Sequence, residues 1–341
     1  MMMKRTPKST IYDIAQKANA SPSTVSAALN GTWKARRIRA ETAERIIKIA
    51  QDFGYSTNLQ ARGLRTAKSG LTALLMPDYN RFFSSLAEAF SSKVRQMGLC
   101  PVIVSTDRDH DEELSTVEKL VSYAIDSLFI AGASCPEEIS RYCQKAQIDH
   151  IFIDQPCALA ASVTTDNVWG ARQLTTEILA SRTPSGDPRR DEPYFIGGDC
   201  HLPVTAGRIE GFREELQSRL GASHDHQIIA SSYDTDYAEQ AIKSLYGQIG
   251  GLPSALFVNS ITSFEGILRF LLTLPEEEVR ACSMGCFDYE PFGELLRFPV
   301  HMIRQRHRAL IATAFELLET KAGPGTLIKV EPKLFSAHHR Q

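Results

Sequence analysis

Residues 10–31 read TIYDIAQKANASPSTVSAALNG, and this stretch predicts two short amphipathic helices joined by a tight polar turn. Apolar residues recur at three- and four-residue spacings on each side of the turn, so each helix should bury one face. Thr10 can cap the first helix, and Ser21 can cap the second, with Pro22 at its first helical position. With a third helix expected over about 40–53, the N-terminal segment should form a small all-α domain.

A helix, a tight turn and a second helix make up the helix-turn-helix unit, in which the second helix enters the major groove of DNA. Outward residues near the start of that helix would lie against base edges, while nearby hydroxyl groups would hold phosphates. The basic loop that follows would contact the DNA backbone without reading its sequence. The candidate DNA contacts of this segment are Thr10, Tyr12, Ser21, Pro22, Ser23, Thr24, Ser26, Ala27, Asn30, Lys34 and Arg36.

The charge of the chain is strongly polarised. Residues 1–70 hold 13 Lys and Arg against four Asp and Glu, a net charge of +9, although the whole chain has a net charge of −2. The remainder of the chain is therefore acidic, with a net charge of −11. A basic head suits a polyanion such as DNA, and repulsion between DNA and the acidic body would orient the protein as it approaches.

From Leu71 onward, short apolar runs alternate with amphipathic stretches, which is the pattern of βαβ units. The pattern repeats after Asp166, so the core is predicted to be α/β with two doubly wound lobes. The segment over 181–193 is rich in Pro, Ser and charge and is expected to be an exposed loop. The expected domains are a headpiece over 1–56, a hinge or linker over 57–69 and a core over 70–341, with lobe 1 at about 70–165 and 299–322 and lobe 2 at about 166–298 and 323–336.

Polar residues follow several of the predicted strands, and small ligands of such sheets bind at the carboxyl ends of the strands. Carboxylate and amide groups there can form hydrogen bonds with the neighbouring hydroxyl groups of a sugar. Polar residues at strand ends also often cap the next helix, so both roles stay open for each of them. The candidates are Asp78, Asp154, Asp166, Ser260, Asp288 and Gln305, together with Phe82.

The composition argues against several other classes of protein. No apolar run is long enough to span a membrane, and the N-terminus MMMKRTPKST lacks the apolar stretch of a secretory signal, so a cytoplasmic protein is expected. Seven scattered cysteines without a CxxC pair favour reduced thiols over disulfides or a zinc site. With no P-loop, GxSxG or HExxH motif, neither enzymatic activity nor a cofactor or metal is expected.

The run SPSTVSAALNG at residues 21–31 resembles the recognition-helix signature of the lactose-repressor and galactose-repressor family (LacI/GalR) of bacterial transcription factors, and the resemblance extends over the whole chain. It implies a helix-turn-helix headpiece on a two-lobed core of the periplasmic-binding-protein fold. It also implies a homodimeric repressor that binds a roughly palindromic DNA operator under the control of a sugar or sugar phosphate between the lobes. Pairing of dimers into tetramers stays open, although the tail after Lys333 has no heptad run that would favour it.

Residues 58–65, NLQARGLR, are too short to form a stable isolated helix and should fold only against a partner. In the family that this chain resembles, the corresponding segment becomes helical in the dimer on DNA. There, a leucine that matches Leu64 opens a central base step from the minor groove. The candidate DNA contacts of this segment are Asn58, Ala61, Arg62, Leu64 and Arg65.

The resemblance also points to particular effector residues. Arg208 and Asp288 match ligand positions of the family. The string RQRHR, which begins at Arg304, resembles the fructose-repressor branch, whose effectors are phosphorylated, so Arg208 and Arg306 could together hold a phosphate. Gln155 stands where that branch has an arginine, and the stretch FIGGDCHLPVTAGRIEGF is more similar to sucrose repressors. Both a sugar and a sugar phosphate therefore stay open as effectors.

One other class of function has the same expected core. A sugar receptor for transport or chemotaxis uses the two-lobed fold without a headpiece. The basic N-terminal segment and the absence of an export signal favour the DNA-binding regulator over the receptor.

Overall fold

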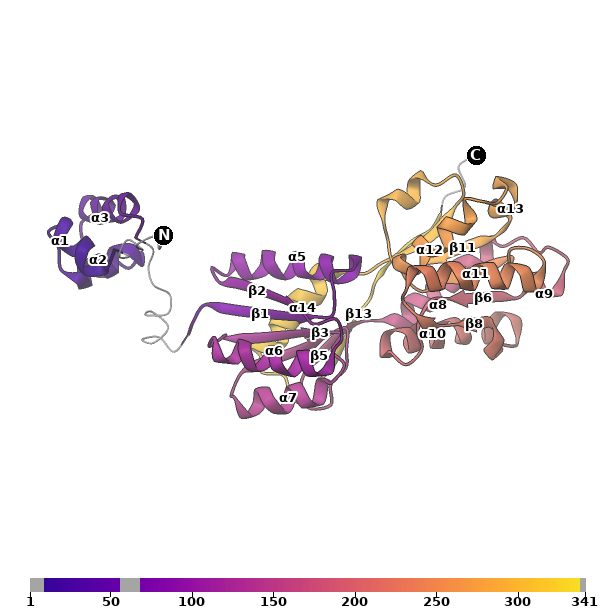
Figure 1. Ribbon diagram of the computed structural model, residues 1–341, viewed down its shortest axis with the longest axis horizontal. Helices are drawn as coiled ribbons and strands as arrows, with labels where there is room; N and C mark the ends of the chain where they lie inside the picture. The colour runs from indigo at the N-terminus through magenta and orange to yellow at the C-terminus, as the bar shows by residue number, and fades with distance from the viewer. Residues whose placement is uncertain (1–8, 56–67, 338–341) are drawn as a thin grey trace, which may run out of the picture. The chain divides into compact units, whose positions relative to one another are not determined.

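The computed structural model describes residues 9–55 and 68–337, and the chain divides into two compact units between Gly70 and Leu71. The N-terminal unit is all-α, and the second unit contains two large, mainly parallel sheets covered by helices (Figure 1). Among the described residues, no helix has both the length and the apolar character needed to cross a lipid bilayer.

The head consists of α1 (Ile11–Lys17), α2 (Pro22–Leu29) and α3 (Ala40–Asp52). The first two helices begin at the predicted caps. The Thr10 hydroxyl and the Asp13 carboxylate form a reciprocal capping box, and the Ser21 hydroxyl accepts the N–H of Thr24 at 3.1 Å. One fully buried aliphatic side chain from each helix lies at the centre of the head, namely Ile14, Val25 and Ile46.

The first lobe of the second unit is built on a six-stranded parallel sheet in the order β13-β5-β4-β3-β1-β2. Its strands are apolar along most of their length because helices cover both faces of the sheet. The strands are β1 (Leu71–Met76), β2 (Cys100–Ser105), β3 (Ser127–Ala131), β4 (Asp149–Ile153), β5 (Ser162–Thr165) and β13 (Leu327–Val330). On one face lie α5 (Arg81–Gln96) and α14 (His307–Glu319), and on the other lie α6 (His110–Ser122) and α7 (Pro136–Lys145).

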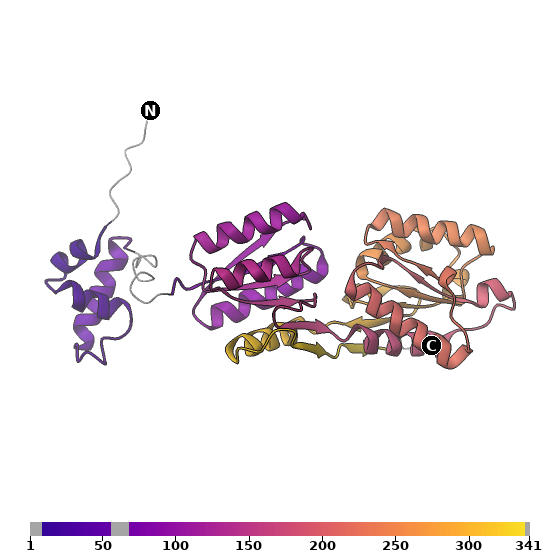
Figure 2. The same ribbon diagram turned by 90° about the horizontal axis from the view of Figure 1, so that it is seen from below.

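The second lobe has the same layered architecture, with a sheet between helices (Figure 2). Its six-stranded sheet has the order β14-β12-β11-β10-β6-β8, in which β14 alone is antiparallel to its neighbour. Its strands are β6 (Pro193–Ile196), β8 (Ile228–Ile229), β10 (Ala255–Val258), β11 (Ser283–Cys286), β12 (Val300–Arg304) and β14 (Lys333–Phe335). The covering helices are α11 (Thr235–Ile249), α12 (Ile261–Leu271) and α13 (Glu276–Ala281) on one face and α8 (Asn167–Ser181) and α10 (Pro203–Leu220) on the other. A small antiparallel ribbon of β7 (Gly198–Asp199) and β9 (Ser231–Ser232) and two 3₁₀ turns, Asp225–Gln227 and Pro291–Leu295, complete the lobe.

The C-terminal part of the chain departs from the predicted lobe boundaries. The sequence predicts residues 299–322 in lobe 1, but β12 pairs with β11 in the second sheet, and of these elements α14 alone packs on the first lobe. Likewise, residues 323–336 are predicted in lobe 2, but β13 pairs with β5 in the first sheet. An apolar run predicts a strand without indicating which of two similar sheets it joins, and this is why the boundaries were misplaced.

The segment over 181–193, predicted to be an exposed loop, contains a short helix α9 (Pro188–Asp191). Arg190 fixes this helix to the second lobe, because its guanidinium donates to the Leu252 carbonyl at 3.0 Å and its own carbonyl accepts the N–H of Ser254 at 2.6 Å. The polar composition of the segment therefore reflects its exposed side chains, while its backbone is held to the core of the lobe.

Candidate DNA-binding face and effector site

The N-terminus of α2 presents small polar side chains to solvent. Pro22 and Ser23 are exposed, and Thr24 and Ser26 are half-buried. The Ser21 hydroxyl lies 2.8 Å from both the Ser23 and the Thr24 hydroxyl oxygens, so three hydroxyl groups gather at the positive end of the helix. This arrangement suits an anion such as a phosphate, and it leaves Ser23 exposed and Ser26 half-exposed along the helix.

Two other predicted contacts in the head differ in exposure. Tyr12 on α1 is 70% exposed, so its ring and hydroxyl are free to reach a partner. Ala27 is only 3% exposed, and the structure does not bring it to the surface that was predicted to meet base edges. The chain after α2 turns back beside it, because the Thr32 N–H donates to the Ala27 carbonyl at 3.0 Å and Trp33 joins the packed core of the head.

The loop after α2 carries the predicted backbone contacts. Lys34 and Arg36 are exposed, and the Lys34 ammonium lies 5.3 Å from the centre of the Trp33 ring. Asn30 has a structural role, since its side-chain amide donates to the Ser26 carbonyl at 2.8 Å at the end of α2. The remaining predicted DNA contacts, Asn58, Ala61, Arg62, Leu64 and Arg65, lie outside the described residues.

The carboxyl ends of the parallel strands in the core carry most of the predicted effector residues, and Asp154 is the most unusual of them. It follows β4, is 8% exposed and has a left-handed backbone with φ of +64°. Its Oδ1 atom is buried without a hydrogen-bond partner. Burial raises the pKa of this carboxyl to about 7, against the attraction of Arg208 and Arg108. An unpaired buried oxygen of this kind is available to accept a ligand hydroxyl.

Asp288 belongs to a hydrogen-bonded chain that links the two lobes. Its Oδ2 accepts the N–H of Ile261 at the start of α12, at 3.0 Å, and its Oδ1 accepts the Gln305 amide at 2.8 Å. The Gln305 carbonyl in turn accepts the hydroxyl of Thr165, at the end of β5 in the first lobe, at 2.7 Å. Burial raises the pKa of Asp288. Both carboxylate oxygens therefore have protein partners, and Gln305 connects the lobes.

Arg208, on α10, is held rigidly although it is charged and only 4% exposed. Its Nε donates to the Asn167 side-chain carbonyl at 2.9 Å, and its Nη1 donates to the backbone carbonyl of Asn259 at 2.7 Å. The guanidinium carbon lies 4.0 Å from the centre of the Phe287 ring, which is the geometry of a cation–π contact. These contacts fix the guanidinium plane before any ligand arrives.

The structure adds residues that the sequence analysis missed. Both side-chain atoms of Asn259, which is fully buried after β10, are without hydrogen-bond partners, as is Nε2 of His307 at the start of α14. The backbone at Gly198 approaches Asn259 so closely that a Cβ there would lie 2.3 Å from its side-chain nitrogen. Burial and, to a smaller extent, the nearby Arg304 lower the pKa of His307 to about 4. Asn259 could have been found from the sequence, because it follows the same predicted strand as Ser260 and immediately precedes it. The sequence analysis proposed Ser260 as the effector residue instead.

Other predicted effector residues are engaged in local structure. Ser260 accepts the N–H of Ser263 as the cap of α12, and Asp166 accepts the N–H of Trp169 as the cap of α8. For Ser260 and Asp166 the capping role that the sequence left open is the one that the structure displays. Asp78 accepts the N–H of Asn80 at 2.7 Å in the turn before α5, and Asn80 itself is the cap of that helix.

A pocket of about 190 Å³ lies between the lobes, and both lobes contribute to its lining. Phe82 of α5 is half-buried in it, with its ring 5.0 Å from that of His307. Arg306 is exposed and does not line this pocket, whereas Arg304 does. The lining includes Arg81, Phe82, Asp288, Arg304, Gln305 and His307.

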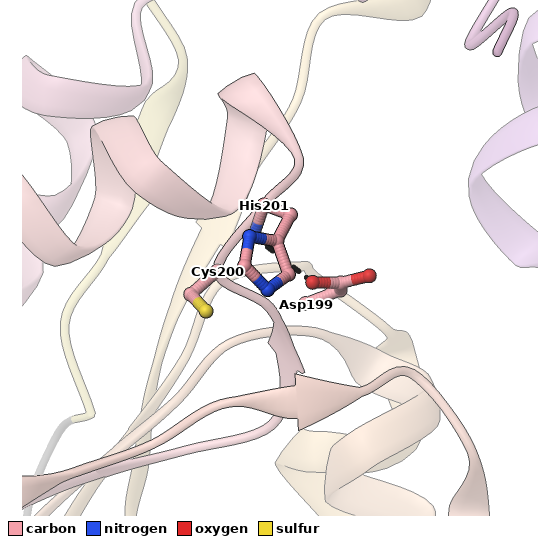
Figure 3. Close-up of side chains that lie close together, drawn as sticks. All are labelled: Asp199, Cys200 and His201. Carbon is pink, nitrogen blue, oxygen red and sulfur yellow. Dashed lines mark hydrogen bonds between the residues drawn. The ribbon is translucent and has the colours of Figure 1, made fainter.

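A separate group of side chains in the second lobe has a composition found in metal sites. Asp199, Cys200 and His201 bring a carboxylate, a thiol and an imidazole within 4.8 Å of one another (Figure 3). The three residues are consecutive, and the Asp199 carboxylate accepts the backbone N–H of His201 at 2.9 Å. Because a turn alone places them together and two of the three are exposed, we assign no metal to this group.

Comparison with known proteins places the chain among regulators. Residues 10–58 match the family model described as bacterial regulatory proteins, lacI family. The chain is 43% identical over 195 residues to the ribitol operon repressor of Klebsiella aerogenes, in an alignment that covers 56% of this chain and 71% of that protein. It is 26% identical over 320 residues to the sucrose operon repressor of Klebsiella pneumoniae, which covers 92% of each protein.

The fold is similar to that of the lac repressor dimer bound to operator and the anti-inducer ONPF. The TM-score is 0.78, with 19% sequence identity and coverage of 96% of this chain and 98% of that chain. The predicted combination of a helix-turn-helix headpiece with a two-lobed α/β core is therefore confirmed.

Proposed function

Because the chain belongs to the lacI family of bacterial regulatory proteins, we propose that it represses carbohydrate-metabolism genes by binding operator DNA as a homodimer. The protein is a DNA-binding transcriptional regulator and not an enzyme, since its relatives are operon repressors. The proposed place of action is the cytoplasm, where a bacterial regulator meets its DNA. The proposed effector is a sugar, a sugar alcohol or a sugar phosphate, in keeping with relatives named for ribitol and sucrose operons.

The headpiece, proposed to span residues 1–56, supplies the DNA-reading surface. The exposed N-terminus of α2 supports this role, because it gathers the hydroxyl groups of Ser21, Ser23 and Thr24 at the positive end of the helix, with Ser23 exposed. Lys34 and Arg36 add positive charge in the following loop. Residues 57–69 are proposed as the hinge that pairs in the dimer, with Leu64 as the residue that opens the central base step.

The core, proposed to span residues 70–341, binds the effector between its lobes. One observation carries this proposal: the strand ends of both lobes present buried polar atoms without protein partners, at Asp154 in the first lobe and Asn259 in the second. Such atoms cost folding free energy unless a ligand or water pairs with them, so their concentration at the expected site is informative. Arg208, already fixed in position, lies beside Asn259.

Regulation follows from the way in which the lobes are connected. An effector can change operator affinity only to the extent that it binds one arrangement of the lobes better than another. Gln305 joins Asp288 to Thr165, so a ligand that contacts Asp288 would act on a hydrogen bond that spans the two lobes. A change at this link would alter the spacing of the paired hinges and hence the fit to the operator.

The first experiment is selection of binding sites from a random duplex pool with the purified full-length protein at near-physiological salt. A palindrome with a deformable central step is expected, and its affinity should change when ribitol or a related carbohydrate is added. Enrichment of no sequence, even at low salt, would overturn the proposed function. Carbohydrate binding without DNA binding would favour the receptor class instead.

A pair of head variants sharpens this experiment. Ser23→Ala should relax sequence preference at one position of each half-site, because a base contact is removed. Lys34→Ala should weaken binding to all sequences by a similar factor. It should also reduce the slope of log affinity against log salt concentration by about one for each half-site, because one phosphate contact is lost. Identical effects of the two variants on selectivity would contradict the assigned roles.

A further inference from the structure

Three hydroxyl groups at the start of α2 form one hydrogen-bonded chain with Ser21 at its centre. The Ser21 oxygen accepts the backbone N–H of Thr24 at 3.1 Å and lies 2.8 Å from the hydroxyl oxygens of both Ser23 and Thr24. A serine hydroxyl has one proton to donate and two lone pairs with which to accept. These three partners therefore use the whole hydrogen-bonding capacity of Ser21, which can reach a DNA phosphate only by giving up one of them.

The number of protons limits what the two outer members of the chain can do. Since Ser21 already accepts one N–H, it can accept one hydroxyl proton and must donate its own proton to the other hydroxyl. Two directions satisfy this condition. In the first, Ser23 donates to Ser21 and Ser21 donates to Thr24, which leaves the Thr24 O–H free. In the second, Thr24 donates to Ser21 and Ser21 donates to Ser23, which leaves the Ser23 O–H free.

A bound DNA phosphate would choose between these two directions. The match of residues 10–58 to the lacI family makes DNA the partner of this helix, independently of the hydroxyl groups. Ser23 is exposed and Thr24 is half-buried, so Ser23 is placed against base edges and Thr24 against a phosphate. Phosphate oxygens only accept hydrogen bonds, and a bond to an ionised oxygen is stronger than one between neutral groups. The phosphate therefore favours the first direction, in which every hydroxyl of the chain donates toward it.

We infer that a phosphate held by Thr24 makes Ser23 a hydrogen-bond acceptor, so that Ser23 selects adenine or cytosine in each half-site of the operator. In the first direction the proton of Ser23 is donated to Ser21, and only lone pairs of Ser23 face the groove. In the major groove, adenine presents its N6 amino group and cytosine its N4 amino group, whereas guanine and thymine present acceptors and no donor. The inference rests on the proposed function and narrows the operator that the head reads.

The chain of hydroxyl groups couples a contact that carries no sequence information to one that does. An ordinary phosphate contact changes affinity for all sequences by a similar factor. Loss of the Thr24 hydroxyl would also remove the group to which Ser21 donates, so that Ser21 could donate to Ser23 instead. Ser23 would then have a free O–H for guanine or thymine, and its preference would narrow. A residue that contacts only phosphate would thus influence which base is read.

The test is selection of binding sites from a random duplex pool with the full-length wild type and variants of the head. Ser23→Ala first identifies the position that Ser23 reads, as the position at which the wild-type preference is lost. There, the wild type should favour adenine and cytosine over guanine and thymine by about fivefold, the effect of one neutral hydrogen bond. Thr24→Val retains the shape of the side chain without its hydroxyl, so the preference should fall to about twofold or less, and overall affinity should fall as well.

Two controls separate the coupling from a simple loss of affinity. Thr24→Ser keeps a hydroxyl at this position and should retain the base preference. Lys34→Ala removes an exposed cation from the loop after α2 and should weaken binding without changing the base preference at the Ser23 position. Thermal unfolding checks that each variant is folded, and Thr24→Ala, which removes the same hydroxyl, replaces Thr24→Val if the latter is not.

The possible results distinguish the inference from the proposed function. Guanine or thymine at the Ser23 position of the wild-type site would overturn the inference while leaving the proposed function intact. The same holds for a Thr24→Val protein that loses affinity with its base preference unchanged. A Ser23→Ala protein with the wild-type preference at every position would also overturn the inference, because Ser23 would then read no base. Enrichment of no sequence by the wild type would overturn the proposed function itself.

Discussion

Asp154 has three features that each cost folding free energy: a left-handed backbone, burial of a carboxyl group and an oxygen without a partner. The nearby Arg208 and Arg108 reduce this cost without forming ion pairs with it. Functional residues are often kept in environments that folding alone would not favour. At the scale of a single residue, stability and ligand binding should therefore respond in opposite directions to a change at this position.

The pH dependence of stability is the first prediction at this scale. The unfolded chain loses the Asp154 proton near the ordinary value of 3.8, whereas the native protein retains it to about pH 7. Native stability should therefore fall as pH rises between these values, by up to about 4 kcal/mol from this group. Asp154→Asn should unfold at a higher temperature than the wild type at pH 8 and at a similar temperature at pH 4. An equal difference at both pH values, measured by thermal unfolding without effector, would contradict this explanation.

Arg208 gives a second prediction, because two nitrogens of its planar guanidinium donate at the same time to Asn167 and to the Asn259 carbonyl. Arg208→Lys keeps the charge but cannot make both hydrogen bonds and the ring contact together, so effector affinity should fall by about 10- to 100-fold. The matched control is Arg213→Lys on the same helix, whose exposed partner is Asp225. Calorimetric titration of both variants measures effector affinity. Equal losses of affinity would show that the two hydrogen bonds of the Arg208 guanidinium are unimportant for binding.

At the scale of elements, glycines set how closely some helices approach. In α10, a Cβ at Gly211 would lie 2.3 Å from the Val168 carbonyl oxygen of α8, so Gly211→Ala should force the helices apart and lower stability by about 1–3 kcal/mol. Gly247 on α11 has no atom within 4 Å of such a Cβ, and Gly247→Ala should raise stability by up to about 1 kcal/mol. Urea unfolding of the two variants should thus shift in opposite directions, and shifts of the same sign would refute the packing argument.

The elements also show what could be read from the sequence. Helix boundaries in the head were predictable because Thr10, Ser21 and Pro22 are local signals that act within a turn of the chain. The positions of Asp154 and Asp288 at strand ends were predictable because parallel strands align their carboxyl ends. The unpaired side-chain amide of Asn259 and the burial of Ala27 depend on residues that approach from elsewhere in the chain. Such contacts cannot be predicted from the spacing or the composition of the local sequence.

At the scale of the whole core, Arg81 connects the lobes at the edge of the pocket. It joins α5 of the first lobe to Glu265 and Glu290 of the second, with all three side chains partly exposed. Exposed ion pairs contribute at most about 1 kcal/mol, so Arg81→Gln should speed effector release by up to about fivefold, and the difference from wild type should shrink at high salt. Arg280→Gln, which breaks an exposed pair with Glu276 inside one lobe, is the control. The rate of effector release is measured by stopped flow. A rate that Arg81→Gln leaves unchanged would show that the ion pair does not restrain the lobes.

The interleaving of the two sheets has a consequence for synthesis of the protein. The first sheet receives β13 only after almost the whole second lobe has been made, and the second sheet receives β14 last. On the ribosome, the emerging first lobe therefore has an unpaired edge at β5 through most of translation. A premature stop codon near residue 325 would remove both strands at once, so a truncated product should be cleared by proteases and should not persist as a half-functional competitor for the operator.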